Sequence, residues 1–196
     1  MEKIRKVELH QVRPSDIELL KNNPDEFWKD VTEIGSSAFE CVDNFEKITI
    51  PSGIEKIEEF AFYRSKNLRQ VGFSEGLLSI GLQAFLGCKS LEMLKLPKSV
   101  RSLSEGSFRF CDSLKTIDIS LGNERLLIMD EAFADCQNLE SVKILGKDVF
   151  ISSKVFANCP NLKLVTISKN TLYMSNTFEN CNENLEIKSV DLEEGV

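Results

Sequence analysis

Histidine is almost absent from this chain of 196 residues, and the single one, His10, lies near the N-terminus. A serine or cysteine nucleophile activated by histidine, and a zinc site built from cysteine and histidine, would both need that residue. The sequence also lacks GxxxxGKS or GxxxxGKT, GxSxG and HExxH, which mark a phosphate-binding loop, a nucleophile elbow and a metalloprotease helix. We therefore expect a protein that is not an enzyme and that has no cofactor and no metal.

Long hydrophobic runs are absent as well. No segment reaches the roughly 18 consecutive apolar residues that a membrane-spanning helix needs. The first residues, MEKIRKVELHQVRPSD, contain no apolar stretch typical of a signal peptide. The sequence is consistent with a cytoplasmic protein or with an excerpt of a longer exported one, and we expect no membrane insertion.

Positive charge is scarce relative to negative charge. The chain has 24 lysines and arginines against 31 aspartates and glutamates, and its formal net charge is −7 at pH 7. Nucleic acids bind proteins that present a basic surface. We therefore expect no nucleic-acid partner, and we interpret the acidic balance as a contribution to solubility.

Phenylalanine, in contrast, recurs at nearly constant intervals. Successive members of the series are 23, 23, 23, 25, 23 and 22 residues apart. A small or medium-sized residue precedes each member, and a large apolar residue follows six or seven positions later. A self-similar period in the low twenties indicates a solenoid, in which each coil buries its apolar side chains against the next coil. The series is Phe39, Phe62, Phe85, Phe108, Phe133, Phe156 and Phe178.

Two apolar residues separated by one other residue follow each of the first six phenylalanines at a fixed distance. Alternation of this kind has the period of a β-strand with one buried face. Equivalent strands of successive coils then pair in parallel, about 4.8 Å apart. The pairs are Ile48/Ile50, Val71/Phe73, Leu94/Leu96, Ile117/Ile119, Val142/Ile144 and Val165/Ile167.

The segments IPSGIEKIEEFAFYRSKNL, LPKSVRSLSEGSFRFCDSL and AFADCQNLESVKIL resemble the BspA-like type of leucine-rich repeat. The resemblance implies an α/β solenoid, a right-handed superhelix with stacked parallel strands, short helical turns and an N-terminal helical cap. It also implies ligand binding through a curved sheet face and no catalytic residues. Proteins of this type are often surface or secreted binding proteins of bacteria and parasitic protists. Two extra residues around Leu121-Gly122-Asn123 depart from the pattern, and we interpret them as a surface bulge.

The resemblance divides the chain into three parts. We expect an N-terminal cap or leader at residues 1–33, a repeat domain at 34–190 and an acidic tail at 191–196. Because a solenoid has one continuous core, no boundary is expected inside the repeats. The seven units are 34–56, 57–79, 80–102, 103–127, 128–150, 151–172 and 173–190.

The leader contains the signals of two short helices. Ser15 is expected to cap the first, and Asn23 is expected to cap a second that begins at Pro24. Trp28, the only tryptophan, lies just before the repeats. One interpretation is a cap that covers the first coil, since solenoids need capped ends. The other is a regulatory role, in which the leader acts as an effector helix that the repeats display.

Cysteine occupies one position of the repeat, three residues after the phenylalanine. We interpret this column as reduced thiols that fill a tight buried slot, and disulfides between adjacent coils are the alternative. One cysteine per coil forms a line of thiols, whereas zinc needs ligands that converge on a point. The column contains Cys88, Cys111, Cys136, Cys159 and Cys181, with Ser65 in the second unit, while Cys41 lies out of register.

The residues between the apolar strand positions should point to solvent. One outward column, Glu46, Arg69, Glu92, Lys115, Glu140 and Lys163, alternates in charge, which favours pairing between neighbouring strands. Two apolar residues stand in another column where solvent is expected, and charged residues flank them. If this face binds a protein, the candidate residues are Met93, Lys95, Asp118, Lys143 and Leu164.

The sequence therefore predicts a non-catalytic leucine-rich repeat protein that mediates protein–protein interaction through its curved sheet face. The alternative is a structural or scaffold segment of a longer repeat array with no ligand of its own. The partner is expected to be a protein, and the pattern does not identify it.

Overall fold

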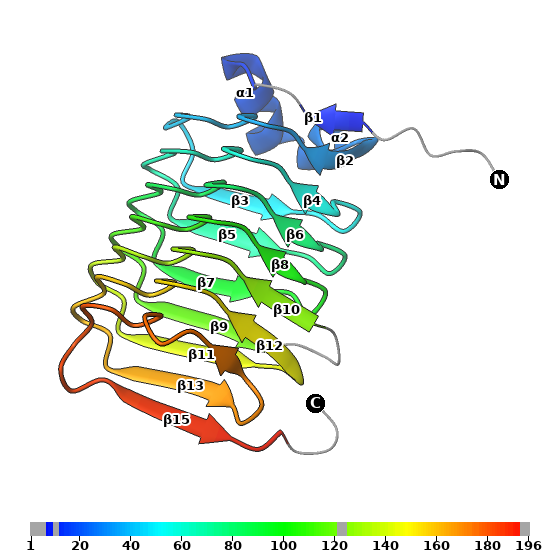
Figure 1. The fold of residues 1–196 in the computed structure, drawn as a ribbon. Helices are drawn as coiled ribbons and strands as arrows, with labels where there is room; N and C mark the ends of the chain where they lie inside the picture. The colour runs from blue at the N-terminus through cyan, green and yellow to red at the C-terminus, as the bar shows by residue number, and fades with distance from the viewer. Residues whose placement is uncertain (1–6, 10–11, 121–124, 193–196) are drawn as a thin grey trace.

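The chain is a stack of about seven similar coils. The computed structural model describes residues 7–9, 12–120 and 125–192, and Figure 1 shows the coils piled from the N-terminal to the C-terminal end. His10 and the predicted bulge at 121–123 lie outside the described residues. The predicted parallel-strand solenoid is confirmed, and helices are few.

Each full coil contributes one strand to each of two sheet faces, and every described strand pair is parallel. The first face is an eight-stranded sheet in the order β1-β2-β4-β6-β8-β10-β12-β14. Its strands are β1 (Val7–Leu9), β2 (Val31–Ile34), β4 (Lys56–Ile57), β6 (Ser79–Ile80), β8 (Ser102–Leu103), β10 (Arg125–Ile128), β12 (Asp148–Ile151) and β14 (Leu172–Tyr173).

The second face contains the strands that the alternating pairs predict. It consists of a two-stranded sheet, β3-β5, and a five-stranded sheet, β7-β9-β11-β13-β15, which follow one another along the stack. The hydrogen-bonded ladder is thus interrupted between β5 and β7. The strands are β3 (Lys47–Ile50), β5 (Gln70–Phe73), β7 (Met93–Leu96), β9 (Thr116–Ser120), β11 (Ser141–Leu145), β13 (Leu164–Ser168) and β15 (Glu186–Val190).

The spacing of the phenylalanines did not predict the eight-stranded sheet. Its middle strands β4, β6 and β8 are only two residues long, too short for apolar alternation to be visible. A buried apolar residue nevertheless marks each of its strands from β2 to β12, five positions before the repeated phenylalanine. These residues are Ile34, Ile57, Ile80, Leu103, Ile128 and Ile151.

The phenylalanines form a stacked column through the core. Adjacent ring centres are 4.7 to 5.6 Å apart from Phe39 to Phe178, and the rings are within 10° of parallel. The first six rings are fully buried, and Phe178 is half-buried in the last coil. Because each ring needs the next for burial, the stack is one cooperative core.

The cysteine column bridges consecutive coils. The thiol of Cys88 donates to the backbone carbonyl of Phe62 at 3.1 Å, and that of Cys111 donates to Phe85 at 3.4 Å. Cys136, Cys159 and Cys181 repeat the contact, and the Ser65 hydroxyl makes it to Phe39 at 2.6 Å. The predicted buried slot is confirmed for Cys88, Cys111, Cys136 and Cys159, whereas Cys181 is only half-buried. A small side chain with a donor is what this slot accommodates.

The segment around each phenylalanine is a run of tight turns in the described coils. Around the first six rings, the residues two positions before and two after the ring adopt left-handed backbone angles, as Phe60 (φ 57°) and Arg64 (φ 54°) do around Phe62. The turns also form a backbone ladder between coils: the Phe62 N–H, for example, donates to the Ala84 carbonyl at 2.7 Å. We expected short helical turns in this segment. The structure has non-helical turns instead, and hydrogen bonds between coils hold them in place.

Two helices, α1 (Pro14–Asn22) and α2 (Pro24–Phe27), lie at the N-terminal end of the stack (Figure 1). The expectation that Ser15 caps α1 is wrong. Pro14, whose φ is fixed, takes the first helical position. The Asp16 carboxylate then reaches back to accept the Arg13 N–H at 2.7 Å, and this hydrogen bond lowers the pKa of Asp16. The expected start of α2 is confirmed, because the Asn23 side chain accepts the Glu26 N–H.

The apolar sides of the two helices continue the core of the first coil. Ile17, Leu20, Phe27 and Trp28 are buried, and the Phe27 ring centre lies 6.3 Å from that of Phe39. Trp28 therefore packs at the N-terminal end of the core instead of facing solvent. Among the described residues, no helix has the length and apolar character needed to cross a membrane.

A substitution at Gly81 tests how closely neighbouring coils approach one another. A methyl group at this position would lie 2.7 Å from the backbone of Glu58 and Glu59 in the preceding coil. We predict that Gly81→Ala lowers the free energy of unfolding by about 1–3 kcal/mol, measured by denaturant titration, because backbone must shift to admit it. Gly72→Ala is the control, since its methyl group would meet only the Thr49 side chain at 3.4 Å. Equal stability of the two variants would contradict this account.

Candidate binding face

A groove of about 620 Å³ lies on the second face, where the ladder between β5 and β7 is interrupted. Gly72 has no side chain to fill the outward space on β5, and the neighbouring Phe73 is half-exposed. Met93 on β7 is 61% exposed and stands beside this space. The groove, which we call the sheet groove, is lined by Gln70, Val71, Gly72, Phe73, Glu75, Met93, Lys95, Leu96, Pro97, Lys98, Asp118 and Ser120.

The sheet groove brings together three of the five candidate residues. Met93, Lys95 and Asp118 line it, and Lys95 lies in register with Asp118 on the adjacent strand. Lys143 continues the same column on β11. Leu164 is on β13, three strands beyond Met93 and so about 14 Å away along the stack. Neither Lys143 nor Leu164 lines the groove.

Charged groups on this face are largely unpaired. The alternating column forms one ion pair in the described part of the chain, between Arg69 and Glu92 at 3.5 Å. Charge alternation therefore contributes little, since exposed pairs are worth about 0–1 kcal/mol. Asp118 accepts the Ser120 hydroxyl at 2.8 Å, whereas Lys95 and Lys143 make no ion pair with any described residue. Neither ammonium group is therefore held in place by an ion pair within the described residues.

One rim of the sheet groove is held in place by backbone contacts. The Glu75 carboxylate accepts the N–H groups of Lys98 and Ser99 in the next coil, at 3.1 and 3.2 Å. The rim therefore carries a negative charge that is already hydrogen-bonded, while Lys95 presents a free positive charge. Met93 therefore lies in a groove with charges of both signs.

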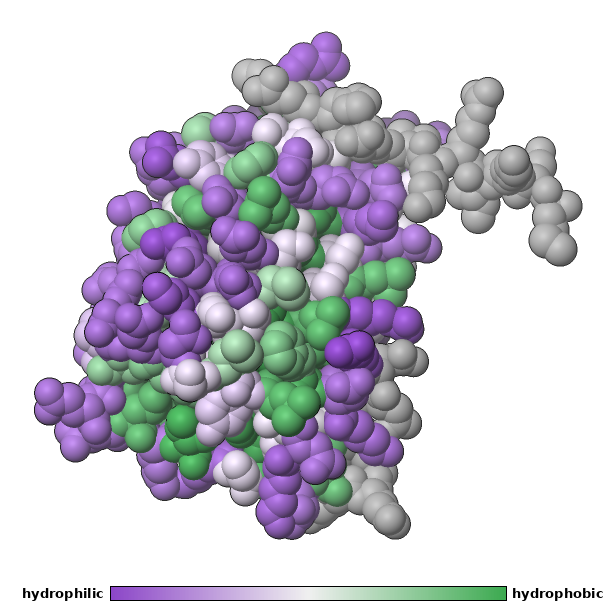
Figure 2. All heavy atoms as spheres, viewed as in Figure 1, coloured by the Kyte–Doolittle hydropathy of each residue, from purple (hydrophilic) through white to green (hydrophobic). Residues whose placement is uncertain are grey.

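The eight-stranded sheet carries a second set of outward apolar residues that sequence reasoning missed. Leu127, Phe150 and Leu172 are in register on β10, β12 and β14. Leu127 and Phe150 are half-exposed, and Leu172 is 66% exposed. In the view of Figure 2, apolar side chains gather over the C-terminal half of the stack among hydrophilic ones. Leu127, Phe150 and Leu172 are 23 and 22 residues apart in the sequence. This spacing could have revealed the set if the strands of this sheet had been predicted.

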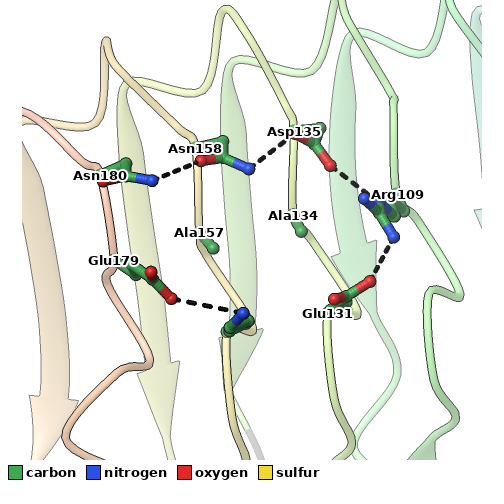
Figure 3. A pocket seen from close by; sticks show the side chains of 9 residues that line it. Arg109, Glu131, Ala134, Asp135, Ala157, Asn158, Glu179 and Asn180 are labelled. Carbon is green, nitrogen blue, oxygen red and sulfur yellow. Dashed lines mark hydrogen bonds and ion pairs between the residues drawn. The ribbon is translucent and has the colours of Figure 1, made fainter.

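The turn segments of the later coils carry a continuous polar network (Figure 3). Arg109 is paired with both Glu131 and Asp135. Asp135 accepts the Asn158 amide at 2.9 Å, and Asn158 accepts that of Asn180 at 3.0 Å. Because these groups satisfy one another across four coils, the network stabilises the stack and leaves little free charge.

The buried thiols are unsuited to nucleophilic chemistry. Burial raises the pKa values of Cys88, Cys111, Cys136 and Cys159 well above the usual range. The nucleophile is the thiolate, so a thiol held neutral is inert, and a neutral thiol is what donates to the phenylalanine carbonyl. Within residues 7–9, 12–120 and 125–192, no group of three or more His, Cys, Asp or Glu side chains could hold a metal ion.

A family model for the BspA type leucine-rich repeat region matches residues 32–144 and 119–196, with six copies. The chain belongs to the BspA-type leucine-rich repeat family. Leucine-rich repeat proteins generally mediate protein interaction, and the family and its fold are generally non-enzymatic. A search of curated protein sequences found no match.

Solved structures of bacterial leucine-rich repeat proteins share this fold. One from Treponema pallidum, TpLRR, is 25% identical with a TM-score of 0.63, and the match covers 73% of this chain and 67% of that one. One from Eubacterium ventriosum is 22% identical with a TM-score of 0.67, and the match covers 84% of this chain. The present chain spans only 49% of the length of the Eubacterium ventriosum protein.

The accessibility of the six cysteines gives a direct test of the coil packing. We predict that a thiol reagent at pH 8 modifies Cys41 rapidly and the half-buried Cys181 slowly, because both lie partly or fully at the surface. Cys88, Cys111, Cys136 and Cys159 should react only after denaturation, since they are buried and their pKa values are raised. Absorbance or mass measurement follows the reaction, and Cys41→Ser should remove the fast phase. Rapid modification of the four buried thiols in the folded protein would be incompatible with the stacked column.

Proposed function

We propose that this BspA-type chain is a non-catalytic protein-binding module that holds a partner protein on the sheet groove. The observation that carries the proposal is Met93, 61% exposed beside the space left by Gly72. An apolar residue in a hollow, with charges around it, is typical of the centre of a protein interface. A thioether side chain also adapts its shape to a partner.

The energetics of the groove favour binding of a protein with a mixed apolar and charged surface. Burying the exposed part of Met93, which is 61% exposed, contributes about 1–2 kcal/mol. Lys95 has no ion pair to break within the described residues, so a carboxylate from the partner gains a contact at little cost. Phe73, which is half-buried and packs against the core beside Phe85, also lines the groove and adds some apolar surface.

The proposal treats the repeats and the leader as one working unit. In this arrangement residues 34–190 form the repeat domain, residues 1–33 form the cap and residues 191–196 form the acidic tail. The buried contacts of Phe27 and Trp28 with the first coil support the role of the leader as a cap. The sheet groove then lies on the second to fourth coils, counted from that cap.

A scaffold role is the second candidate, and the C-terminal end of the stack favours it. β14 and β15 are the edge strands of the two sheets within the described residues. Leu172, Tyr173 and Ile187 on these strands are 66%, 45% and 38% exposed. Such an edge fits stacking against another coil or another copy. Concentration-dependent self-association in analytical ultracentrifugation, abolished by Leu172→Glu with Ile187→Glu, would favour this role.

Capture of partners by the immobilised protein tests the binding proposal. We predict that Met93→Glu combined with Lys95→Glu reduces the recovery of a specific partner from a cell lysate more than tenfold, since residues at an interface centre contribute about 2 kcal/mol or more. The melting temperature should be unchanged, because both side chains point to solvent.

A matched variant on the same face provides the control. Lys143→Glu with Leu164→Glu makes the same charge change outside the sheet groove and should retain the partner. If this control loses the partner and the groove variant retains it, the site lies elsewhere on the face. If both variants retain it, the contact does not involve this face.

A further inference from the structure

A second groove lies on the turn side of the stack, away from the two sheet faces. It spans three consecutive coils, has a volume of about 420 Å³ and involves the residues that follow Phe62, Phe85 and Phe108. We call it the turn groove, and its lining residues are Tyr63, Arg64, Lys66, Leu86, Gly87, Lys89 and Phe110. It is lined by no residue of the sheet groove.

The shape of the turn groove depends on Gly87. Arg64, Gly87 and Phe110 occupy equivalent left-handed positions in successive coils, with φ values of 54°, 71° and 58°. A methyl group at Gly87 would approach the Arg64 side chain to 3.3 Å. Because glycine stands between two large side chains in this column, a hollow opens between Arg64 and Phe110.

The charge of the turn groove is opposite to that of the whole chain. Arg64, Lys66 and Lys89 line it, and no carboxylate does, although acidic residues outnumber basic ones by 31 to 24 overall. Asp112 pairs with Lys89 at 3.1 Å. In the described part of the chain, Arg64 and Lys66 form no ion pair. The Arg64 guanidinium lies 5.0 Å from the centre of the Tyr63 ring, a contact that orients it over the surface.

The turn groove also has an apolar wall. Phe110 is 40% exposed, which is unusual for a side chain of this size, and Leu86 and Tyr63 are half-exposed beside the hollow. In the coils that follow, the turn segments carry Glu131, Asp135 and Asn158, which are hydrogen-bonded or paired with neighbours (Figure 3). Unpaired cations and exposed aromatic surface therefore occur together in the coils that precede this hydrogen-bonded network.

We infer that the turn groove binds an acidic peptide segment of a partner protein, in which carboxylates flank one aromatic side chain. The aromatic side chain lies in the hollow over Gly87 against Phe110 and Leu86. The carboxylates contact the Arg64 guanidinium, whose planar fork matches a carboxylate, and the Lys66 ammonium. This site is independent of the sheet groove and gives the chain a second, chemically distinct contact surface.

Fluorescence anisotropy with a labelled probe tests the inference. The probe is a short peptide with one phenylalanine among glutamates, and the comparison peptide has glutamine in place of each glutamate. The glutamate peptide should bind at low salt, weaken as ionic strength rises and bind about tenfold more tightly than the glutamine peptide. Equal binding of the two peptides, or no binding of either, would overturn the proposal.

Variants locate the site. Arg64→Glu with Lys66→Glu should weaken the glutamate peptide about tenfold or more, and Phe110→Ser should weaken it without changing its salt dependence. Lys147→Glu with Lys163→Glu is the control, because it makes the same charge change at exposed lysines outside the groove and should leave binding unchanged. Equal losses of peptide binding in both double variants would show that binding responds to net charge alone. That result would overturn the assignment of the site to the turn groove.

Two further measurements distinguish a peptide site in the turn groove from binding at the sheet groove and from general affinity for anions. Met93→Glu with Lys95→Glu should leave peptide binding unchanged, so failure of the sheet groove and failure of the turn groove are distinguishable. A sulfated polysaccharide such as heparin provides anionic charge without an aromatic side chain. Tight binding of heparin together with no binding of the peptide would overturn the assignment of a peptide ligand.

Discussion

Each coil of this solenoid is held by hydrogen bonds to the backbone of its neighbours, and this constraint governs most of its sequence. The two sheet faces provide parallel ladders, and the turn segments provide another, such as the Phe62 N–H to the Ala84 carbonyl. Thiols of the cysteine column add a contact to the phenylalanine carbonyls, and Ser65 substitutes for a thiol in one coil. These ladders persist where the spacing is 25 or 22 residues instead of 23, so they constrain the paired positions and the core residues rather than the exact length of each coil.

The side chains that do not hold the coils together are the ones that remain for function. On the turn side of the later coils, Arg109, Asp135 and Asn158 bond to one another and reinforce the stack. Elsewhere a glycine interrupts a column of larger residues and opens a hollow, at Gly72 on the second face and at Gly87 on the turn side. Both hollows have an exposed apolar side chain beside them, Met93 or Phe110, and lysines or an arginine without an ion pair in the described residues. The two proposed binding surfaces therefore both lie at local departures from the repeat.

The period of the phenylalanines was enough to predict the solenoid, the parallel strands of the second face and the buried cysteine slot. It did not reveal the eight-stranded sheet, because strands such as Lys56–Ile57 and Ser79–Ile80 are too short to show alternation. For the site, repeat register placed Met93, Lys95 and Asp118 side by side, but it could not show that the ladder breaks between β5 and β7 or that Leu164 lies outside the groove. The turn groove depends on left-handed turns that bring Arg64, Gly87 and Phe110 into one column, and no propensity rule predicts such angles for arginine or phenylalanine.

The central claim is that a protein partner contacts the sheet groove, and site-specific photocrosslinking tests it most directly. A photoreactive residue at position 93 would be compared with one at position 19, where Leu19 is 39% exposed on α1 in the N-terminal helices, outside the sheet groove. After irradiation in a cell lysate, we expect a discrete adduct from position 93 and none from position 19, detected by mass shift on a denaturing gel. The same adduct from both positions, or an adduct from position 19 alone, would contradict the account.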